Sequence, residues 1–190
     1  IKYDGFSKGS TTLIKTITAS SDSTIDFVDG SSSVVLDSTY KEYLFIFNNI
    51  HGSAEGQLTF NLSADSGSNY NVTKTTTHFI GEHGEDGTFS SVAYQTGDDL
   101  AQGTGFKKIH RSTDFGNADE SASGFLHLFN PSSTTFVKHF MARTASAGVA
   151  RAHDSYIAGY GNTTSAVDAV QFKMSDGNID AGVIQLIGIT

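Results

Sequence analysis

Apolar and polar residues alternate with a period of two in several segments of this chain, and the clearest case is segment 57–64. Its apolar positions are Leu58, Phe60, Leu62 and Ala64, and its polar positions are Gln57, Thr59, Asn61 and Ser63. This alternation predicts a half-buried β-strand with one apolar face. In segment 41–47, Tyr43, Phe45 and Phe47 form one apolar face, and Leu44 and Ile46 form another. A strand with two apolar faces is expected to be central in its sheet.

Other segments rich in Thr, aromatic and β-branched residues predict further strands. These segments are 13–18, 69–80, 88–95, 124–129, 134–143, 168–174 and 179–189. Segments 124–129 and 134–143 flank Asn130-Pro131-Ser132-Ser133, and segments 168–174 and 179–189 flank Asp176-Gly177. Each pair is predicted to form a hairpin around its turn. Between the strands, residues 81–87 are expected to form an acidic loop, and residues 97–103 a loop with room for one helical turn.

Ten or so short strands, with little helix, predict an all-β fold. The expected architecture is an antiparallel β-sandwich of jelly-roll type. Residues 11–190 are expected to form one domain, preceded by an N-terminal arm or linker at residues 1–10. The last apolar segment, 179–189, is expected to be tied into the middle of a sheet.

Composition agrees with many strands and turns, since the chain holds 24 Ser, 21 Thr and 20 Gly beside 14 Phe. It has no Cys, which excludes disulfides and thiolate metal sites. A net charge of −8 disfavours nonspecific binding to nucleic acid. No run of 18 apolar residues is present, so no membrane insertion is expected.

Ser7 is a candidate nucleophile, because Gly5-Phe6-Ser7-Lys8-Gly9 matches the G-x-S-x-G pattern. A nucleophile elbow follows a strand and precedes a helix, whereas only four residues stand before this match and a Thr-rich strand segment follows it. We therefore interpret the match as a product of the high Ser and Gly content.

Neither the acidic nor the histidine residues have the spacing of a known metal site. The loop carboxylates are Glu82, Glu85, Asp86, Asp98, Asp99, Asp119 and Glu120. The histidines are His51, His78, His83, His110, His127, His139 and His153. We interpret the carboxylates as solvated turn residues, and the basic segment 107–111 as their salt-bridge partner, within the chain or on another subunit. No catalytic, cofactor-binding or metal residue is predicted, no cofactor is expected, and the ligand-binding residues are unknown.

Three segments together resemble a family of small β-sandwich virion proteins common in tailed and marine bacteriophages. Segment 36–50 carries a tyrosine followed by an apolar strand, and segment 63–70 is similar to the family's S-x-D-x-G-x-x-Y turn. Segment 175–189 is similar to its closing S-G-x-I-x-x-G-x-I-x-L-Y-G-I motif. Two departures occur there, since Asp176 is inserted and Ile187 replaces the usual Tyr. The resemblance covers roughly the first 80 and the last 20 residues, and in the middle it extends to general character only.

The resemblance implies a non-enzymatic virion protein, in a tail or fibre assembly or as a capsid decoration protein. Such a protein would assemble in the bacterial host cytoplasm, as a homo-oligomer with a trimer favoured, and would contact other virion proteins. The main alternative is a carbohydrate-binding or host-receptor-binding sandwich that recognises a host surface glycan. Its ligand would meet loop aromatics around Tyr156 and Tyr160, or around Phe79 and His83. A glycan-degrading enzyme with loop carboxylates is a third hypothesis.

Overall fold

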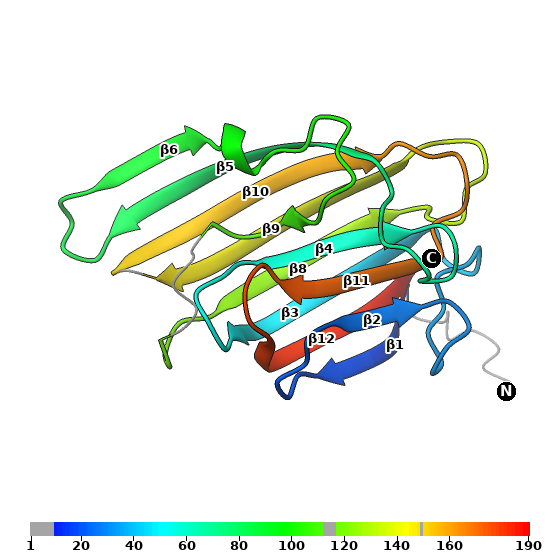
Figure 1. Cartoon of the computed structure of the whole chain (residues 1–190), viewed down its shortest axis with the longest axis horizontal. Coiled ribbons are helices and arrows are strands. Elements are labelled where there is room, and N and C mark those ends of the chain that lie inside the picture. Colours follow the sequence, from blue (N-terminus) through cyan, green and yellow to red (C-terminus); the bar gives the residue numbers. More distant parts are fainter. Residues whose placement is uncertain (1–9, 112–116, 149) are drawn as a thin grey trace, which may run out of the picture.

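The computed structural model describes residues 10–111, 117–148 and 150–190, which form two β-sheets lying face to face (Figure 1). The larger sheet has eight strands, in the spatial order β1 (Thr11–Thr18), β12 (Ile179–Ile189), β3 (Glu42–Gly52), β8 (Ala122–Phe129), β9 (Lys138–Gly148), β10 (Arg151–Gly161), β5 (Lys74–Gly84) and β6 (Ser90–Tyr94). The smaller sheet has four, in the order β2 (Ile25–Val28), β11 (Ala169–Met174), β4 (Leu58–Ser63) and β7 (Lys107–Lys108). The predicted all-β antiparallel sandwich is confirmed, and its jelly-roll connectivity stays a prediction. Nine of the ten residues of the predicted arm, 1–9, lie outside the described residues.

Aromatic side chains fill the space between the two sheets. Phe172 of β11 meets Phe27, Phe45 and Phe47 edge to face, with ring centroids 5.3 to 6.1 Å apart. All four rings are buried. Burying each stabilises the fold by about 1.5 to 3 kcal/mol relative to leaving it exposed. Because Phe45 and Phe47 come from β3, this core confirms that segment 41–47 forms a central strand.

Strand β4 is buried on both faces, so the prediction of a half-buried strand was wrong. Its polar residues Thr59, Asn61 and Ser63 are as inaccessible as its apolar ones. Asn61 shows why, because its amide donates to the carbonyl oxygens of Tyr70 and Thr104 and its Oδ1 accepts from the ammonium of buried Lys74. The connections that follow β4 and precede β7 therefore cover the outer side of the small sheet.

The turn at Asp176-Gly177 does not join a hairpin, and this prediction is corrected. Strand β11 pairs with β2 and β4 in the small sheet, whereas β12 pairs with β1 and β3 in the large one. Gly177 has φ 68°, a backbone conformation that glycine adopts at low cost, and the chain crosses there from one sheet to the other. The expectation that segment 179–189 is tied into a sheet is confirmed, as is the β8–β9 hairpin.

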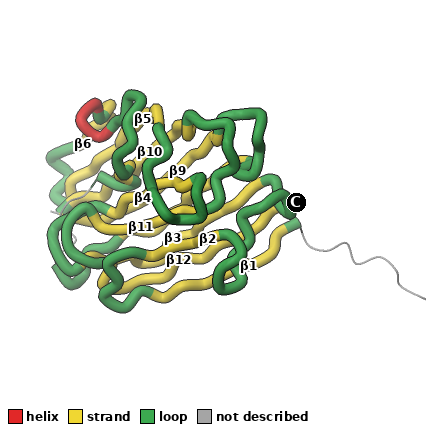
Figure 2. The backbone as a smooth tube through the Cα atoms, turned by 45° about the vertical axis from the view of Figure 1, so that its right-hand side comes forward, coloured by secondary structure: helices red, strands yellow, loops and turns green. Residues whose placement is uncertain are grey.

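The small sheet covers only part of the large one. In Figure 1 it lies over β12, β3, β8 and β9, while β10, β5 and β6 extend beyond it. Segment 95–111, which includes the short 3-10 helix η1 (Thr96–Asp98), packs over that end (Figure 2). Strand β5 runs to Gly84, so Glu82 and His83 belong to a strand and the predicted acidic loop begins later, at Glu85. Among the described residues, no strand or helix packs on the opposite face of the large sheet, which we call the outer face.

Candidate binding surface on the large sheet

One row of side chains crosses the outer face from strand to strand. Its members are direct cross-strand partners, namely Gln185, Ile46, Phe125, Arg143, Tyr156, Phe79 and Tyr94. Paired residues in neighbouring strands project from the same side of a sheet. The row therefore places four aromatic rings and a guanidinium group side by side across seven strands.

The outer face also holds most of the exposed apolar side chains. Among the described residues, seven large apolar side chains are 37% to 83% exposed. Six of them lie on the outer face, namely Leu13, Phe79, Val92, Tyr94, Phe125 and Met141. The seventh, Phe136, is in the loop between β8 and β9. Exposed apolar side chains that gather on one face are typical of interaction sites, which makes this face a candidate.

Tyr156 lies at the centre of the row, with a neighbour on each side. The ring of Phe79 stacks on it with centroids 5.0 Å apart and planes 3° from parallel, and the guanidinium carbon of Arg143 lies 4.5 Å from its centroid. Arg143 donates two hydrogen bonds to Asp154, from Nε at 3.0 Å and from Nη2 at 2.7 Å. These hydrogen bonds lower the pKa of the Asp154 carboxyl. The ring and the ion pair hold each other in place.

At the centre of the outer face an acidic and a basic side chain are paired, although the whole chain carries −8. Arg143 is paired with Asp154, and Glu42 lies 2.9 Å from the imidazole of His127. A surface rich in aromatic residues, Met and Arg, with few unpaired charges, has the composition of a protein interface core.

The aromatic residues proposed from the sequence lie on this face, but not in loops. Tyr156 and Tyr160 belong to β10, and Phe79 and His83 belong to β5. Phe125, Met141 and Arg143 were not identified from the sequence. The available signal was the second apolar face of segment 41–47, which implied that something covers Leu44 and Ile46.

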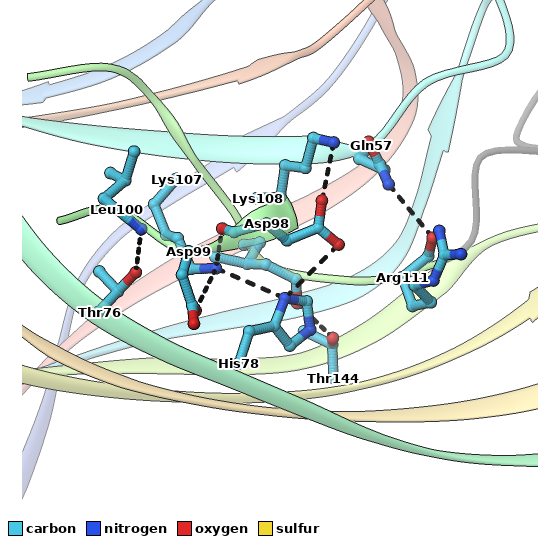
Figure 3. Close-up of polar contacts among 11 residues, drawn as sticks. Gln57, Thr76, His78, Asp98, Asp99, Leu100, Lys107, Lys108, Arg111 and Thr144 are labelled. Atoms are coloured by element: carbon cyan, nitrogen blue, oxygen red, sulfur yellow. Dashed lines mark hydrogen bonds and ion pairs between the residues drawn. The ribbon is translucent and has the colours of Figure 1, made fainter. Parts of the chain in front are cut away.

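A polar cluster lies on the inner side of β5, beneath segment 95–111 (Figure 3). Lys107 Nζ donates to the carbonyl oxygen of Asp98 at 2.6 Å and lies 4.0 Å from the Asp99 carboxylate. It also lies 3.4 Å from His78 Nδ1, and Lys108 Nζ donates to Asp98 Oδ1 at 2.9 Å. The basic segment therefore pairs with an acidic loop of its own chain. Asp98 and Asp99 are mostly buried, which corrects their interpretation as solvated residues.

Burial sets the protonation of this cluster. Desolvation lowers the pKa of Lys107 to about 8, and desolvation with the nearby Lys107 charge lowers the pKa of His78 to about 4. His78 is therefore neutral at neutral pH. The contacts join η1 and β7 to β5, so the cluster anchors segment 95–111 to the large sheet.

The remaining candidates do not converge on one centre. Ser7 lies outside the described residues. His153 Nε2 lies 3.2 Å from Glu82 Oε1 and its strand partner is Ser146, yet no hydrogen bond joins the histidine to the serine hydroxyl. Asp86 accepts hydrogen bonds from Thr88 in an exposed turn. Within the described ranges, no three His, Asp or Glu side chains gather as metal ligands would.

Fold and surface define the class of this protein as an antiparallel β-sandwich, with an apolar face on which no element of the described ranges packs. Comparison of the chain with protein-family models, curated proteins and solved structures found no match. In the part of the chain that the structure describes, no helix has the length and apolar character needed to cross a membrane.

Proposed function

We propose that this protein is a non-enzymatic structural component of a bacteriophage virion, assembled in the bacterial host cytoplasm. It would lie on the particle surface, in a tail or fibre assembly or as a capsid decoration protein. It would act as a homo-oligomer, with a trimer favoured, in contact with other virion proteins. The observation that carries the proposal is the outer face, which bears six of the seven exposed large apolar side chains in the described ranges.

Two further features support this role. The outer face stands on long strands, three of which, β9, β10 and β5, have 11 residues each and pair along their length, so its side chains are held on a rigid support. Virion proteins act in many copies, so a moderate contact at each copy gains strength by multivalency. The similarity of segments 36–50, 63–70 and 175–189 to phage virion proteins indicates the kind of particle.

The test is the presence of the chain in purified particles of the phage that encodes it. Particles are banded in a density gradient, their proteins are quantified by mass spectrometry, and an antiserum against the chain is used for gold labelling in electron microscopy. The proposal predicts a fixed stoichiometry to the major capsid protein and labelling at one kind of site. A chain found only in the soluble lysate would refute it.

A carbohydrate-binding or host-receptor-binding module is the second candidate, and one observation favours it. The paired polar groups of Arg143 and Asp154 border an open hollow on the outer face that is also lined by Gly81, Ser91 and Phe125. Arginine and carboxylate groups beside an aromatic ring suit sugar hydroxyls. A glycan array with the wild-type chain and Tyr156→Ala tests it, since this candidate requires a signal that the variant loses.

A further inference from the structure

We infer that the outer face is an interface between copies of this chain, with Tyr156 and Arg143 at the centre of the contact. The inference rests on the homo-oligomer of the proposed function and names the surface that forms it. The occupant of the face is therefore a second copy.

The area of the outer face fits a second copy. Strands β3, β8, β9, β10 and β5 lie about 4.8 Å apart, and a stretch of about seven residues along each spans roughly 24 Å. The flat area of this region is about 600 Å², and the relief of its side chains increases the accessible area. A stable interface buries about 800 Å² on each partner. The five strands alone provide about three quarters of that area, and β12 and β6, which flank them in the sheet, extend it, so the outer face is large enough for a stable contact with a second copy.

The charge of the outer face also favours a second copy. Two copies at −8 each repel one another, and the contact that costs least is one without uncompensated acidic groups. On the outer face the carboxylates of Asp154 and Glu42 already lie beside Arg143 and His127. Arg143 and Asp154 neutralise each other within one chain, so the centre of the face brings no net charge to a contact with a second copy. A contact through this face therefore avoids most of the repulsion between two acidic chains.

The shape of the outer face suits a second copy as well. The row through Phe125, Tyr156 and Phe79 forms a ridge, and the adjacent rows present small side chains. Ala145 and Gly81 flank it on one side, as strand partners of Asp154. On the other side lies a hollow of about 290 Å³ that includes Thr77, Met141 and Ala158 in its lining. A ridge beside a furrow can pack against the same pair of features on another copy, at the spacing of about 10 Å found between stacked sheets.

The same geometry disfavours a sugar at the centre of the face. Both faces of the Tyr156 ring are occupied, one by Phe79 and the other by Arg143. The nitrogen atoms Nε and Nη2 of Arg143 are held by Asp154. Sugar rings stack on open aromatic faces, and Tyr156 offers its edge instead.

The experiment is sedimentation velocity of the purified full chain from about 1 to about 200 µM, a range that detects dissociation constants of ordinary oligomers. Wild type is compared with Met141→Asp, which places a charge on the outer face at a side chain that is 50% exposed. The matched control is Phe136→Asp, since Phe136 is 69% exposed and lies off the face. The inference predicts a dimer for wild type and for the control, because a face that packs against the same face of another copy closes as a pair. Met141→Asp should weaken association by about 30-fold or more, as the loss of an interface hot spot does.

A second variant, Phe79→Ser, repeats the test on another strand, and thermal melts of all variants establish that they are folded. Three results overturn the inference. The first is a wild type that stays monomeric throughout the concentration range. The second is that Met141→Asp and Phe79→Ser are folded and associate as wild type does. The third is that the control Phe136→Asp loses association to the same extent as Met141→Asp. A monomeric wild type whose binding to particles or glycans is lost in Met141→Asp also overturns it, because the face then has another occupant.

Failure of the inference and failure of the proposed function are distinguishable. A monomer that is present in purified particles overturns the inference and leaves the proposed function in place. An oligomer that forms through this face but is absent from particles supports the inference and refutes the virion role.

Discussion

Arg143 and Tyr156 are cross-strand partners whose side chains stack on the outer face, with the guanidinium carbon 4.5 Å from the ring centroid. The arrangement depends on a third residue, because Asp154 holds the guanidinium group through two hydrogen bonds. A planar guanidinium group that is fixed by a carboxylate can stack on a ring with little further loss of side-chain freedom. Asp154 is thus a positioning residue for the centre of the face.

We predict that Asp154→Asn lowers the free energy of unfolding by less than about 1 kcal/mol, because its ion pair with Arg143 is exposed and screened. Urea denaturation at low and high salt measures this effect. Association should weaken more than stability does, since the freed Arg143 no longer has one orientation. A loss of stability well above this value would contradict the view that the pair acts on the surface.

Lys107→Met should destabilise the fold by about 3 to 5 kcal/mol, the range found when one partner of a buried ion pair is removed. Lys107 is fully buried, and its loss leaves the Asp98 carbonyl and the Asp99 carboxylate without their cation. The control is Lys108→Met, because Lys108 is partly exposed and its ion pair with Asp98 is worth about 1 kcal/mol or less. Equal effects of the two variants in urea denaturation would show that the cluster is not an anchor.

Stability should fall as the pH drops from about 6.5 to about 4, and His78 is one cause. Its pKa is about 4 in the folded chain against an ordinary value of 6.5, because burial opposes its charged form. Between these values the unfolded chain binds more protons, so unfolding becomes more favourable as pH falls. The lowered pKa of His153 has the same sign. Urea titrations from pH 7 to 4 measure the slope.

His78→Gln isolates this contribution, because glutamine keeps a polar side chain and does not titrate. The variant should be less stable than wild type at pH 7 and show a shallower loss toward pH 4. The exposed His83 offers the control His83→Gln. A slope that is unchanged in His78→Gln would assign the acid sensitivity to other groups.

Gly188→Ala should cost about 1 to 3 kcal/mol, the usual effect of overpacking a core. A methyl group at this position of β12 would meet the ring of Tyr40, which packs edge to face on Tyr43. Gly105→Ala is the control, since a methyl group there meets open space. Thermal melts of the two variants make the comparison, and a stable Gly188→Ala would mean that the Tyr40 ring moves aside freely.

The sequence predicts the strands better than it predicts what covers them. The period of two in segment 57–64 indicated a strand. The burial of Asn61, however, depends on hydrogen bonds to the carbonyl oxygens of Tyr70 and Thr104, which only the folded chain brings next to it. Asp176-Gly177 indicated a turn, yet a turn does not determine which sheet the next strand joins. The strand that carries Phe172 pairs with β2 and β4 in the small sheet, and Phe172 contacts Phe27 of β2 there.

The sequence also predicted part of the candidate binding surface on the outer face. Tyr156 and Phe79 were proposed as ligand-binding aromatics, but their contact requires the register between β10 and β5. Arg143 could not be identified, because its role comes from strand partners on both sides. Cross-strand register is set by pairing between segments far apart in the sequence, so it cannot be predicted from a local pattern of residues.

Strand β1 has a consequence for the order in which this chain acquires its structure on the ribosome. Among the described strands its one partner in the large sheet is β12, and Thr11 pairs with Ile189. During translation, β1 must therefore remain without its partner until nearly all of the 190 residues have been made. Pairing at such separation is slow and leaves strand edges open to wrong partners in the meantime. Nascent chains of this protein should accordingly depend on chaperones, and a host with reduced chaperone activity should accumulate it in inclusion bodies.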